Sequence, residues 1–338
     1  MDPRHTARYG LQASRIQIFI YKIFVMGHLM NADEKFDVVG LGVSTLDLLL
    51  VVAELPAGES VQRASESMLQ GGGPVATALV ALARLGSRTA MIDKLGDDWR
   101  GRLIIDGLRK EKVATEWIRT AAGRTSSIAS ILVRRRDGAR AITFSPGTAG
   151  ELDPDELPED IIARATVLHM NGRHFDASLR AARLARARGV KVSFDGGADR
   201  YCDRIRELVA MTDICIVARP FACAYAGRED VAAAAGALLS GGPEIVVITS
   251  GAGGSDVFAR DGEGFHQPAY KVKAVDTTGA GDAFHGAFLH GLVTGLDLKE
   301  CADLAAAVAA MNTGKLGGRG ALPTLAEARN FMGIRVGQ

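Results

Sequence analysis

Short apolar runs that alternate with amphipathic segments are the feature that most restricts the fold of this chain. From residue 165 onward the chain reads ATVLHMNG, ASLRAARLARARG, VKVSFDGG, RIRELVAMT, DICIVA, AAAAGALLSGG and EIVVITSGAGG. Continuous apolar strands are typical of a parallel sheet whose two faces are both covered by helices. We therefore expect an α/β fold with a mainly parallel central sheet, in which ligands bind at the carboxyl ends of the strands.

The same alternation is present in the first half of the chain. A buried strand is expected from Phe36, where FDVVGLG ends in glycines. PVATALVALARLG predicts a helix, because a proline stands in its first turn and Gly86 closes it. RTAMIDKLG then predicts a strand and RGRLIIDGLRKEKV a helix.

Two segments interrupt this rhythm, residues 48–70 and 126–146. The second contains Asp137 and Gly138 between two runs of alternating apolar and polar residues, which is a strong hairpin signal. We expect both segments to form strands of a small accessory sheet that projects from the main domain.

Length and charge favour one large domain that acts on a small molecule. The 338 residues carry 40 Lys and Arg against 39 Asp and Glu, a net charge of +1, so no field would attract nucleic acid or a membrane surface. The four cysteines lack metal-binding or disulfide-scaffold spacing, which predicts reduced thiols and a cytoplasmic protein.

The N-terminus does not fit the α/β pattern. Residues 16–30, IQIFIYKIFVMGHLM, are apolar but interrupted by Lys22, and they are shorter than the roughly 20 residues of a membrane span. We interpret residues 1–35 as an extension outside the fold, Met30 as an alternative start, and residues 36–338 as the folded domain.

The stretch VDTTGAGDAFHGAFLHGL, residues 275–292, carries the strongest chemical signal. Glycines at a helix start let consecutive backbone amides converge on an anion, and the helix dipole reinforces their attraction. Asp282 stands beside them, where a carboxylate could accept a hydroxyl proton. The combination indicates phosphoryl transfer. The alternative is a plain turn with Asp282 as a helix cap.

This stretch resembles the C-terminal signature of the pfkB, or ribokinase-like, carbohydrate kinases. GGGPVATALVALARLG resembles the N-terminal signature of that family, and KLGDDWRG, VSFDGG, VVITSGAGGS and GGRGALP follow in the expected order. The resemblance covers residues 36–332. It implies a three-layer sandwich with a small β-sheet lid, which covers the sugar and often forms a dimer interface, and hence a homodimer that phosphorylates a sugar hydroxyl with ATP.

The resemblance also implies roles for individual residues. Asp282 matches the catalytic base. The backbone anion hole matches Gly279, Ala280 and Gly281. Sugar contacts match Asp47, Gly72 and Gly73, although without the resemblance Asp47 could merely end a strand and the glycines merely form a turn.

The nucleotide and cation positions follow in the same way. ATP would lie between Thr249–Gly254, including Gly251, and the NTGKLGGRG stretch. Asp276 and Thr278 match positions whose oxygens often hold a monovalent cation, so K⁺ is an expected ligand beside Mg²⁺; Asp276 could otherwise be only a turn former.

The chain departs from the family pattern at two places. Thr77 replaces the asparagine of the first signature. The family's Asn-x-x-Glu element, which helps to place Mg²⁺, should fall near residues 219–223, where RPFAC contains neither residue. Mg²⁺ would then be held through water and the ATP phosphates.

The motif variants look most like the sulfofructose kinase branch, which would need a cation for the sulfonate. Arg140 and Arg173 are the candidates, although arginines at such positions are usually solvated. An uncharged ketose stays an alternative substrate. A nucleoside kinase and a non-catalytic sensor are alternative functions.

His285 and His290 do not suggest a metal site. They are five residues apart, which is not the i, i+4 spacing of a helical metal pair, and no third ligand is near in sequence. We interpret both as core or helix-surface histidines.

Overall fold

The computed structural model describes residues 35–59, 61–198 and 200–335. The chain separates at residue 35 into two units, and every helix and strand given below belongs to the second, residues 36–338. The interpretation of the N-terminal extension, including the apolar stretch 16–30, therefore concerns residues that lie outside the described part, except for Lys35.

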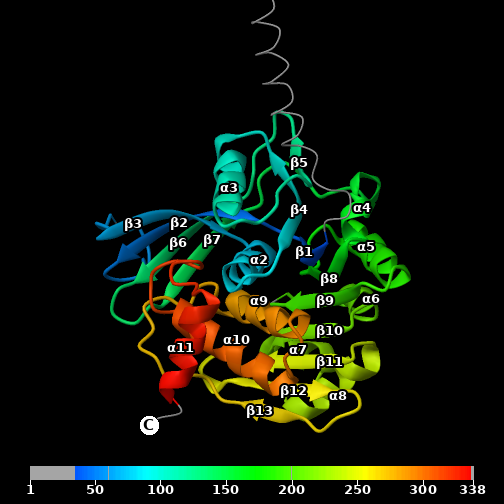
Figure 1. Cartoon of the computed structure of the whole chain (residues 1–338). Coiled ribbons are helices and arrows are strands. Elements are labelled where there is room, and N and C mark those ends of the chain that lie inside the picture. The colour runs from blue at the N-terminus through cyan, green and yellow to red at the C-terminus, as the bar shows by residue number, and fades with distance from the viewer. Residues whose placement is uncertain (1–34, 60, 199, 336–338) are drawn as a thin grey trace, which may run out of the picture. The chain divides into compact units, whose positions relative to one another are not determined.

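A nine-stranded sheet forms the centre of the domain (Figure 1). Its order is β13 (Phe265–Gln267), β12 (Ser255–Ala259), β11 (Ile245–Thr249), β10 (Ile214–Ala218), β9 (Lys191–Gly196), β8 (Ala165–Met170), β1 (Phe36–Leu41), β4 (Thr89–Gly96) and β5 (Ile118–Ala121). The strands from β11 to β5 are parallel, whereas β12 and β13 are antiparallel to their neighbours. The predicted mainly parallel sheet is confirmed.

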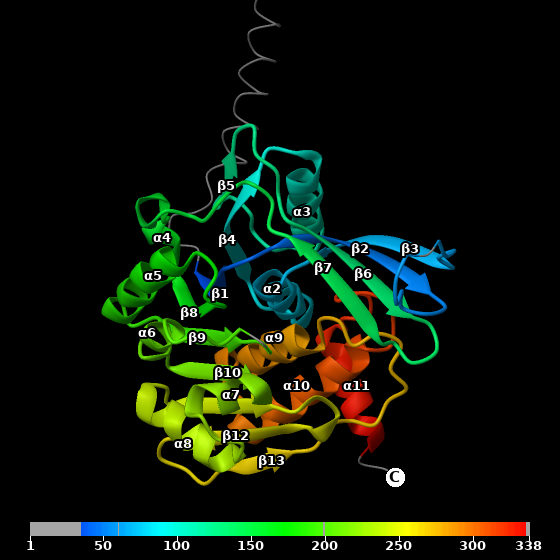
Figure 2. The ribbon, with the colours of Figure 1, turned by 180° about the vertical axis from the view of Figure 1, so that it is seen from behind.

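Helices cover both faces of this sheet, as Figures 1 and 2 show from opposite sides. One layer contains α2 (Pro74–Leu85), α3 (Trp99–Lys110), α9 (Ala280–Val293), α10 (Leu298–Asn312) and α11 (Leu325–Arg335). The other contains α4 (Glu159–Ile162), α5 (Phe175–Ala187), α6 (Ile205–Val209), α7 (Arg219–Ala226) and α8 (Val231–Gly241). Successive strand residues bury into opposite layers, as Val38 and Val39 do on β1. The expected three-layer fold is therefore confirmed.

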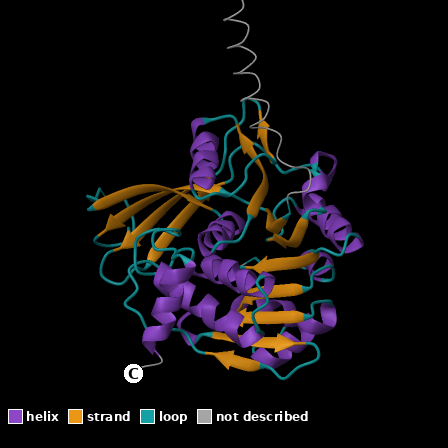
Figure 3. Cartoon of the chain, viewed as in Figure 1, coloured by secondary structure: helices purple, strands orange, loops and turns teal. Residues whose placement is uncertain are grey.

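A second, four-stranded sheet lies beside the main one (Figure 3). Its order is β3 (Glu66–Gly72), β2 (Thr45–Val52), β6 (Ile128–Arg134) and β7 (Arg140–Ser145). The β2–β6 pairing is parallel and the two outer pairings are antiparallel. Its strands lie on the two segments that interrupt the alternation, and β6 and β7 form the hairpin expected at Asp137 and Gly138, where Gly138 has a φ of 69°.

The start of β2 differs from the expected boundary. The segment was expected to begin near residue 48, but β2 begins at Thr45 because Gly42 ends β1 and the chain turns directly into the second sheet. Asp47 is thus the third residue of a strand of the second sheet, and the alternative in which it merely ends a strand is wrong. The short antiparallel edge β12–β13 was not predicted, because three to five residues carry too little periodicity.

Among the described helices, none is long and apolar enough to span a bilayer. All four cysteines lie in the described part and all are free; Cys202 is exposed and the other three are buried.

Candidate active site

The start of α9 has the backbone shape that an anion site needs. Gly279 is the residue that precedes the helix, with a φ of 70°, and a Cβ atom there would lie 2.4 Å from the carbonyl oxygen of Gly318. Only glycine fits this left-handed turn without strain. The first amides of a helix have no carbonyl four residues earlier within the helix, so they can face an anion. The Ala280 amide donates a long hydrogen bond of 3.3 Å to the Thr277 carbonyl.

Asp282 lies in the first turn of α9, and its side chain is partly accessible to solvent. Desolvation and the nearby carboxylate of Asp195 raise the pKa of Asp282 to about 7, while Arg200 and Arg319 act in the opposite direction. A carboxylate with such a pKa is a suitable proton acceptor near neutral pH. The side chain does not point into a closed interior, which is the arrangement that would exclude a catalytic role.

Asp47 is placed by the contact between β2 and β3. Its side chain is 8% exposed, and Thr45 Oγ1 donates a hydrogen bond of 2.6 Å to Asp47 Oδ1. A Cβ atom on Gly72 would come within 2.0 Å of Asp47 Oδ2, so Gly72 makes room for this carboxylate. Desolvation raises the pKa of Asp47, against the opposing effects of Thr45 and Arg319.

Gly73 and Thr77 form the entry to α2. Gly73 precedes the helix with a φ of 91°, and a Cβ atom there would lie 2.4 Å from the carbonyl oxygen of Val43. The local backbone therefore requires glycine at position 73, whether or not a ligand approaches it. Thr77 is 1% exposed, and its Oγ1 accepts a hydrogen bond of 3.1 Å from Arg319 Nε.

Arg319 is the site residue that sequence reasoning missed. Its side chain is 6% exposed, and besides the bond to Thr77 its guanidinium donates to the carbonyl oxygen of Gly72 at 2.8 Å. Desolvation lowers the pKa of Arg319 to about 10, although Asp47 and Asp282 favour its charged form. The signal in the sequence was a lone charged residue in the glycine-rich stretch GGRGALP.

Asp276 joins the anion loop to the segment that carries Arg319. It is fully buried; its Oδ1 accepts hydrogen bonds from the amide and the hydroxyl of Thr278 at 2.9 and 2.7 Å, and its Oδ2 accepts one from the Gly317 amide at 2.9 Å. Both carboxylate oxygens therefore already have protein partners. A cation role for Asp276 and Thr278 stays a prediction.

The expected nucleotide residues lie at the end of β11. Thr249 is its last residue and donates to the Val217 carbonyl at 3.4 Å, while Gly251 and Gly254 have φ values of 57° and 90° in the turn that follows. Because β9, β10 and β11 are parallel neighbours, this turn lies at the same sheet edge as Asp195. The nucleotide-binding roles of Thr249, Gly251 and Gly254 stay predictions.

The two candidate arginines have different partners. Arg140, on β7, donates to Thr277 Oγ1 and so connects the second sheet to the loop before the anion site. Arg173 forms an ion pair with Glu151 at 3.3 Å and borders a small pocket that Phe144 also lines. A common anion site for Arg140 and Arg173 is not formed by these contacts.

Comparisons with known proteins agree with this geometry. The family model of the pfkB family carbohydrate kinases matches residues 35–325. The 5-dehydro-2-deoxygluconokinase of Bacillus subtilis is 29% identical over 325 residues, which covers 91% of this chain and 99% of the relative.

Solved structures give the same result. The crystal structure of a putative ribokinase from Agrobacterium tumefaciens superimposes with a TM-score of 0.81 at 25% identity, covering 90% of this chain and 100% of that one. The adenosine kinase from Sinorhizobium meliloti gives a TM-score of 0.78 at 26% identity, covering 88% and 99%.

Proposed function

This chain belongs to the pfkB family of carbohydrate kinases, enzymes that phosphorylate a sugar hydroxyl with ATP, and we propose that Asp282 is its catalytic base. The observation that carries the proposal is the position of Asp282 beside the glycine-bounded start of α9, with a pKa raised to about 7. Asp282 takes the proton of the attacking hydroxyl, and the amides at the start of α9 stabilise the charge on the transferring phosphoryl group.

We propose that ATP lies between the turn after β11 and the loop around Gly317. Mg²⁺ would be held mainly by phosphate oxygens and water, as this ion prefers. Residues 219–226 form α7, where the family's Asn-x-x-Glu element would fall, and they offer RPFACAYA instead. K⁺ beside Asp276 and Thr278 is proposed from the family resemblance.

The sugar site is proposed to comprise Asp47, Thr77 and Arg319. Arg319 donates a hydrogen bond to Thr77 Oγ1, and it brings a buried positive charge to Asp47 and Asp282. The name of the Bacillus subtilis relative refers to a sugar acid. An acidic substrate is therefore as admissible for this chain as an uncharged ketose. Arg140, Arg173 and the sulfofructose kinase branch stay predictions.

We propose that the second sheet acts as the lid. The register places Phe144 in the same row as Ala129 and Asp47, so Phe144 lies on the same face of the sheet as Asp47. Phe144 is 51% exposed. Closure of such a face over the sugar would exclude water that otherwise hydrolyses ATP.

The opposite face of the second sheet is the proposed homodimer interface. Leu48 pairs with Leu69, and Leu50 with Leu132, which makes a leucine patch; Leu69 is 51% exposed. Exposed apolar patches of this kind mark interaction surfaces. We expect a dimer by light scattering and a monomer for Leu69→Glu. The control is Val272→Glu, at an exposed apolar residue outside this sheet. A dimeric Leu69→Glu protein would exclude this interface.

We further propose a cytoplasmic location, which the four free cysteines support because reducing compartments keep thiols unpaired.

Release of ADP from ATP tests the proposed function. The panel contains fructose, ribose, 5-dehydro-2-deoxygluconate, a sulfonated ketose and adenosine. We expect release that depends on one or more of the sugars. Release with adenosine alone would make the chain a nucleoside kinase, and release with no member would favour the non-catalytic sensor.

The pH dependence of turnover follows from the pKa of Asp282. The base must be ionised, and its pKa is raised to about 7, so kcat/KM should fall about tenfold per pH unit as the pH drops below 7. An ordinary aspartate would place this loss near pH 4. A profile that stays flat down to about pH 5.5 would show either that the pKa of Asp282 is not raised or that turnover does not require its carboxylate.

A further inference from the structure

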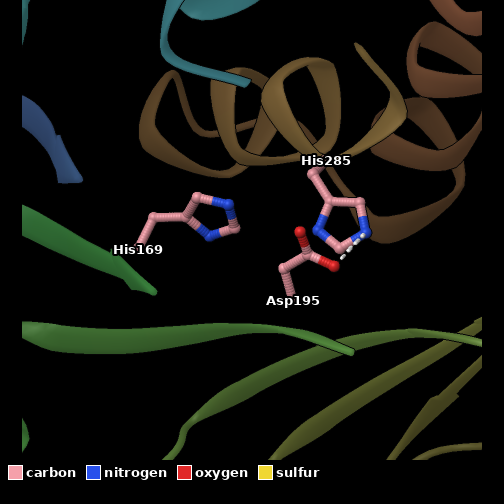
Figure 4. A group of neighbouring side chains, drawn as sticks. All are labelled: His169, Asp195 and His285. Atoms are coloured by element: carbon pink, nitrogen blue, oxygen red, sulfur yellow. Dashed lines mark ion pairs between the residues drawn. The ribbon is translucent and has the colours of Figure 1, made fainter. Parts of the chain in front are cut away.

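Three buried side chains converge one helical turn from Asp282, as Figure 4 shows. They are His169 on β8, Asp195 on β9 and His285 on α9, and their ligand atoms all lie within 4.8 Å of one another. The exposed fractions of the three residues are 0%, 3% and 5%. His285 is buried, as expected for a core histidine. The two residues beside it, His169 and Asp195, come from strands that are distant in sequence.

The fold explains why these side chains meet. Strands β8 and β9 are parallel neighbours with His169 opposite Ser193. On β8, Val167 packs in the α9 layer, and His169, two residues later, lies on the same face of the sheet. On β9, Phe194 packs in the opposite layer, so the next residue, Asp195, lies on the α9 face. His285 enters from the helix above both strands.

Two nitrogen atoms in this group lack the partners that buried polar atoms usually have. His169 Nε2 and His285 Nδ1 are inaccessible to solvent and have no hydrogen-bond partner among the described residues. An unpartnered buried polar atom costs free energy, so native proteins rarely leave two of them together. Figure 4 shows the imidazole rings of His169 and His285 beside the Asp195 carboxylate, between the strands and α9.

The other ring nitrogens have neighbours that favour this arrangement. His169 Nδ1 lies 3.1 Å from Ser193 Oγ, and His285 Nε2 lies 3.7 Å from Asp195 Oδ1. If these nitrogens carry the protons, Nε2 of His169 and Nδ1 of His285 present lone pairs to the shared space. The Ser193 contact is an outer hydrogen bond of the kind that orients a metal-bound imidazole.

We propose that His169, Asp195 and His285 bind one divalent transition-metal ion, of the class of Zn²⁺ or Co²⁺. Two imidazoles and one carboxylate suit such ions, whereas Mg²⁺ prefers oxygen ligands only. Metal bonds of about 2.0–2.2 Å would require the three groups to close inward from their present spacing. The proposed site does not use Asp282 as a ligand, and it is separate from the Mg²⁺ that we propose to bind with ATP.

The test uses the untagged full chain, freed of metal with a chelator and studied without ATP. Zn²⁺ is added, excess is removed, and bound metal is counted; Co²⁺ is titrated by its visible absorption. We expect one equivalent of either ion, and no displacement by a hundredfold excess of Mg²⁺. His169→Gln and His285→Gln should each weaken binding at least tenfold. His290→Gln is the matched control, since His290 is also buried on α9 but contacts Ser87 Oγ at 2.8 Å.

A second measurement needs no variant. In the wild-type protein, Zn²⁺ should shift the imidazole ¹⁵N resonances of two buried histidines and leave those of His174 and His290 in place. Binding of less than 0.2 equivalents, equal affinity in the His285→Gln protein, or unshifted imidazole resonances would overturn the proposal and assign the space to water.

Discussion

Asp282→Asn should reduce kcat by about a thousandfold or more, while the protein stays folded and binds ATP. Asparagine keeps the shape of the side chain but cannot accept the hydroxyl proton, and a positioned general base contributes about 10²–10⁴ in rate.

The raised pKa of Asp282 leads to a second expectation, which concerns the stability of the Asp282→Asn protein. Between about pH 4 and 7 the folded state holds the Asp282 proton more tightly than the unfolded chain, so ionisation of Asp282 above pH 7 opposes folding. Its removal should leave the thermal midpoint unchanged or raise it.

The matched control for this variant is Asp176→Asn. Asp176 also lies in the first turn of a helix, α5, but it is exposed and pairs with Arg204 on the surface. Its replacement should leave kcat within about twofold, because exposed ion pairs contribute little. An Asp282→Asn enzyme with near-normal turnover would remove Asp282 from the mechanism.

Arg319→Met should raise the KM for the sugar and destabilise the fold at the same time. Methionine matches the length of the aliphatic stem but leaves Thr77 Oγ1 and the Gly72 carbonyl without their donor. Removing one partner from a buried charge cluster costs about 3–5 kcal/mol of unfolding free energy. The loss of the cation also raises the pKa of Asp282 further, so the acid limb of the pH profile should move to higher pH.

Denaturant unfolding and the kinetics of the same preparation measure these effects. Arg319→Lys keeps the positive charge but loses the branched guanidinium that donates to both Thr77 Oγ1 and the Gly72 carbonyl. Its pH profile should therefore stay close to that of the wild type, while its KM for the sugar should stay raised. Arg84→Met is the control, because Arg84 forms a partly exposed pair with Glu111 at 2.7 Å. If Arg319→Met had the KM and stability of the wild type, Arg319 would have no part in the sugar site.

The fold could be predicted because its signals are local. Alternating apolar strands and amphipathic helices predicted the main sheet, and the Asp137–Gly138 pair predicted the β6–β7 hairpin. The helix over residues 74–85 begins at Pro74 and is closed by Gly86, which has a φ of 106°. Each of these features depends on neighbours within a few residues.

The parts that could not be predicted depend on distant contacts. Arg319 meets Thr77 across 242 residues, and nothing in GGRGALP says that its arginine turns inward. Asp195 appears in the quoted stretch VSFDGG, but its nearness to Asp282 follows from the order of β8, β9 and α9. The parallel β2–β6 pairing likewise requires knowing which strands leave the main sheet.

The position of the sugar hydroxyl relative to Asp282 tests the central claim most directly. We would solve a crystal structure with a non-hydrolysable ATP analogue and a sugar that the enzyme phosphorylates. It should place an Asp282 carboxylate oxygen about 2.6–3.2 Å from the hydroxyl that faces the terminal phosphorus. The amides at the start of α9 should surround that phosphoryl group. A complex in which this hydroxyl contacts another base, with Asp282 more than about 5 Å away and no bridging water, would contradict the account.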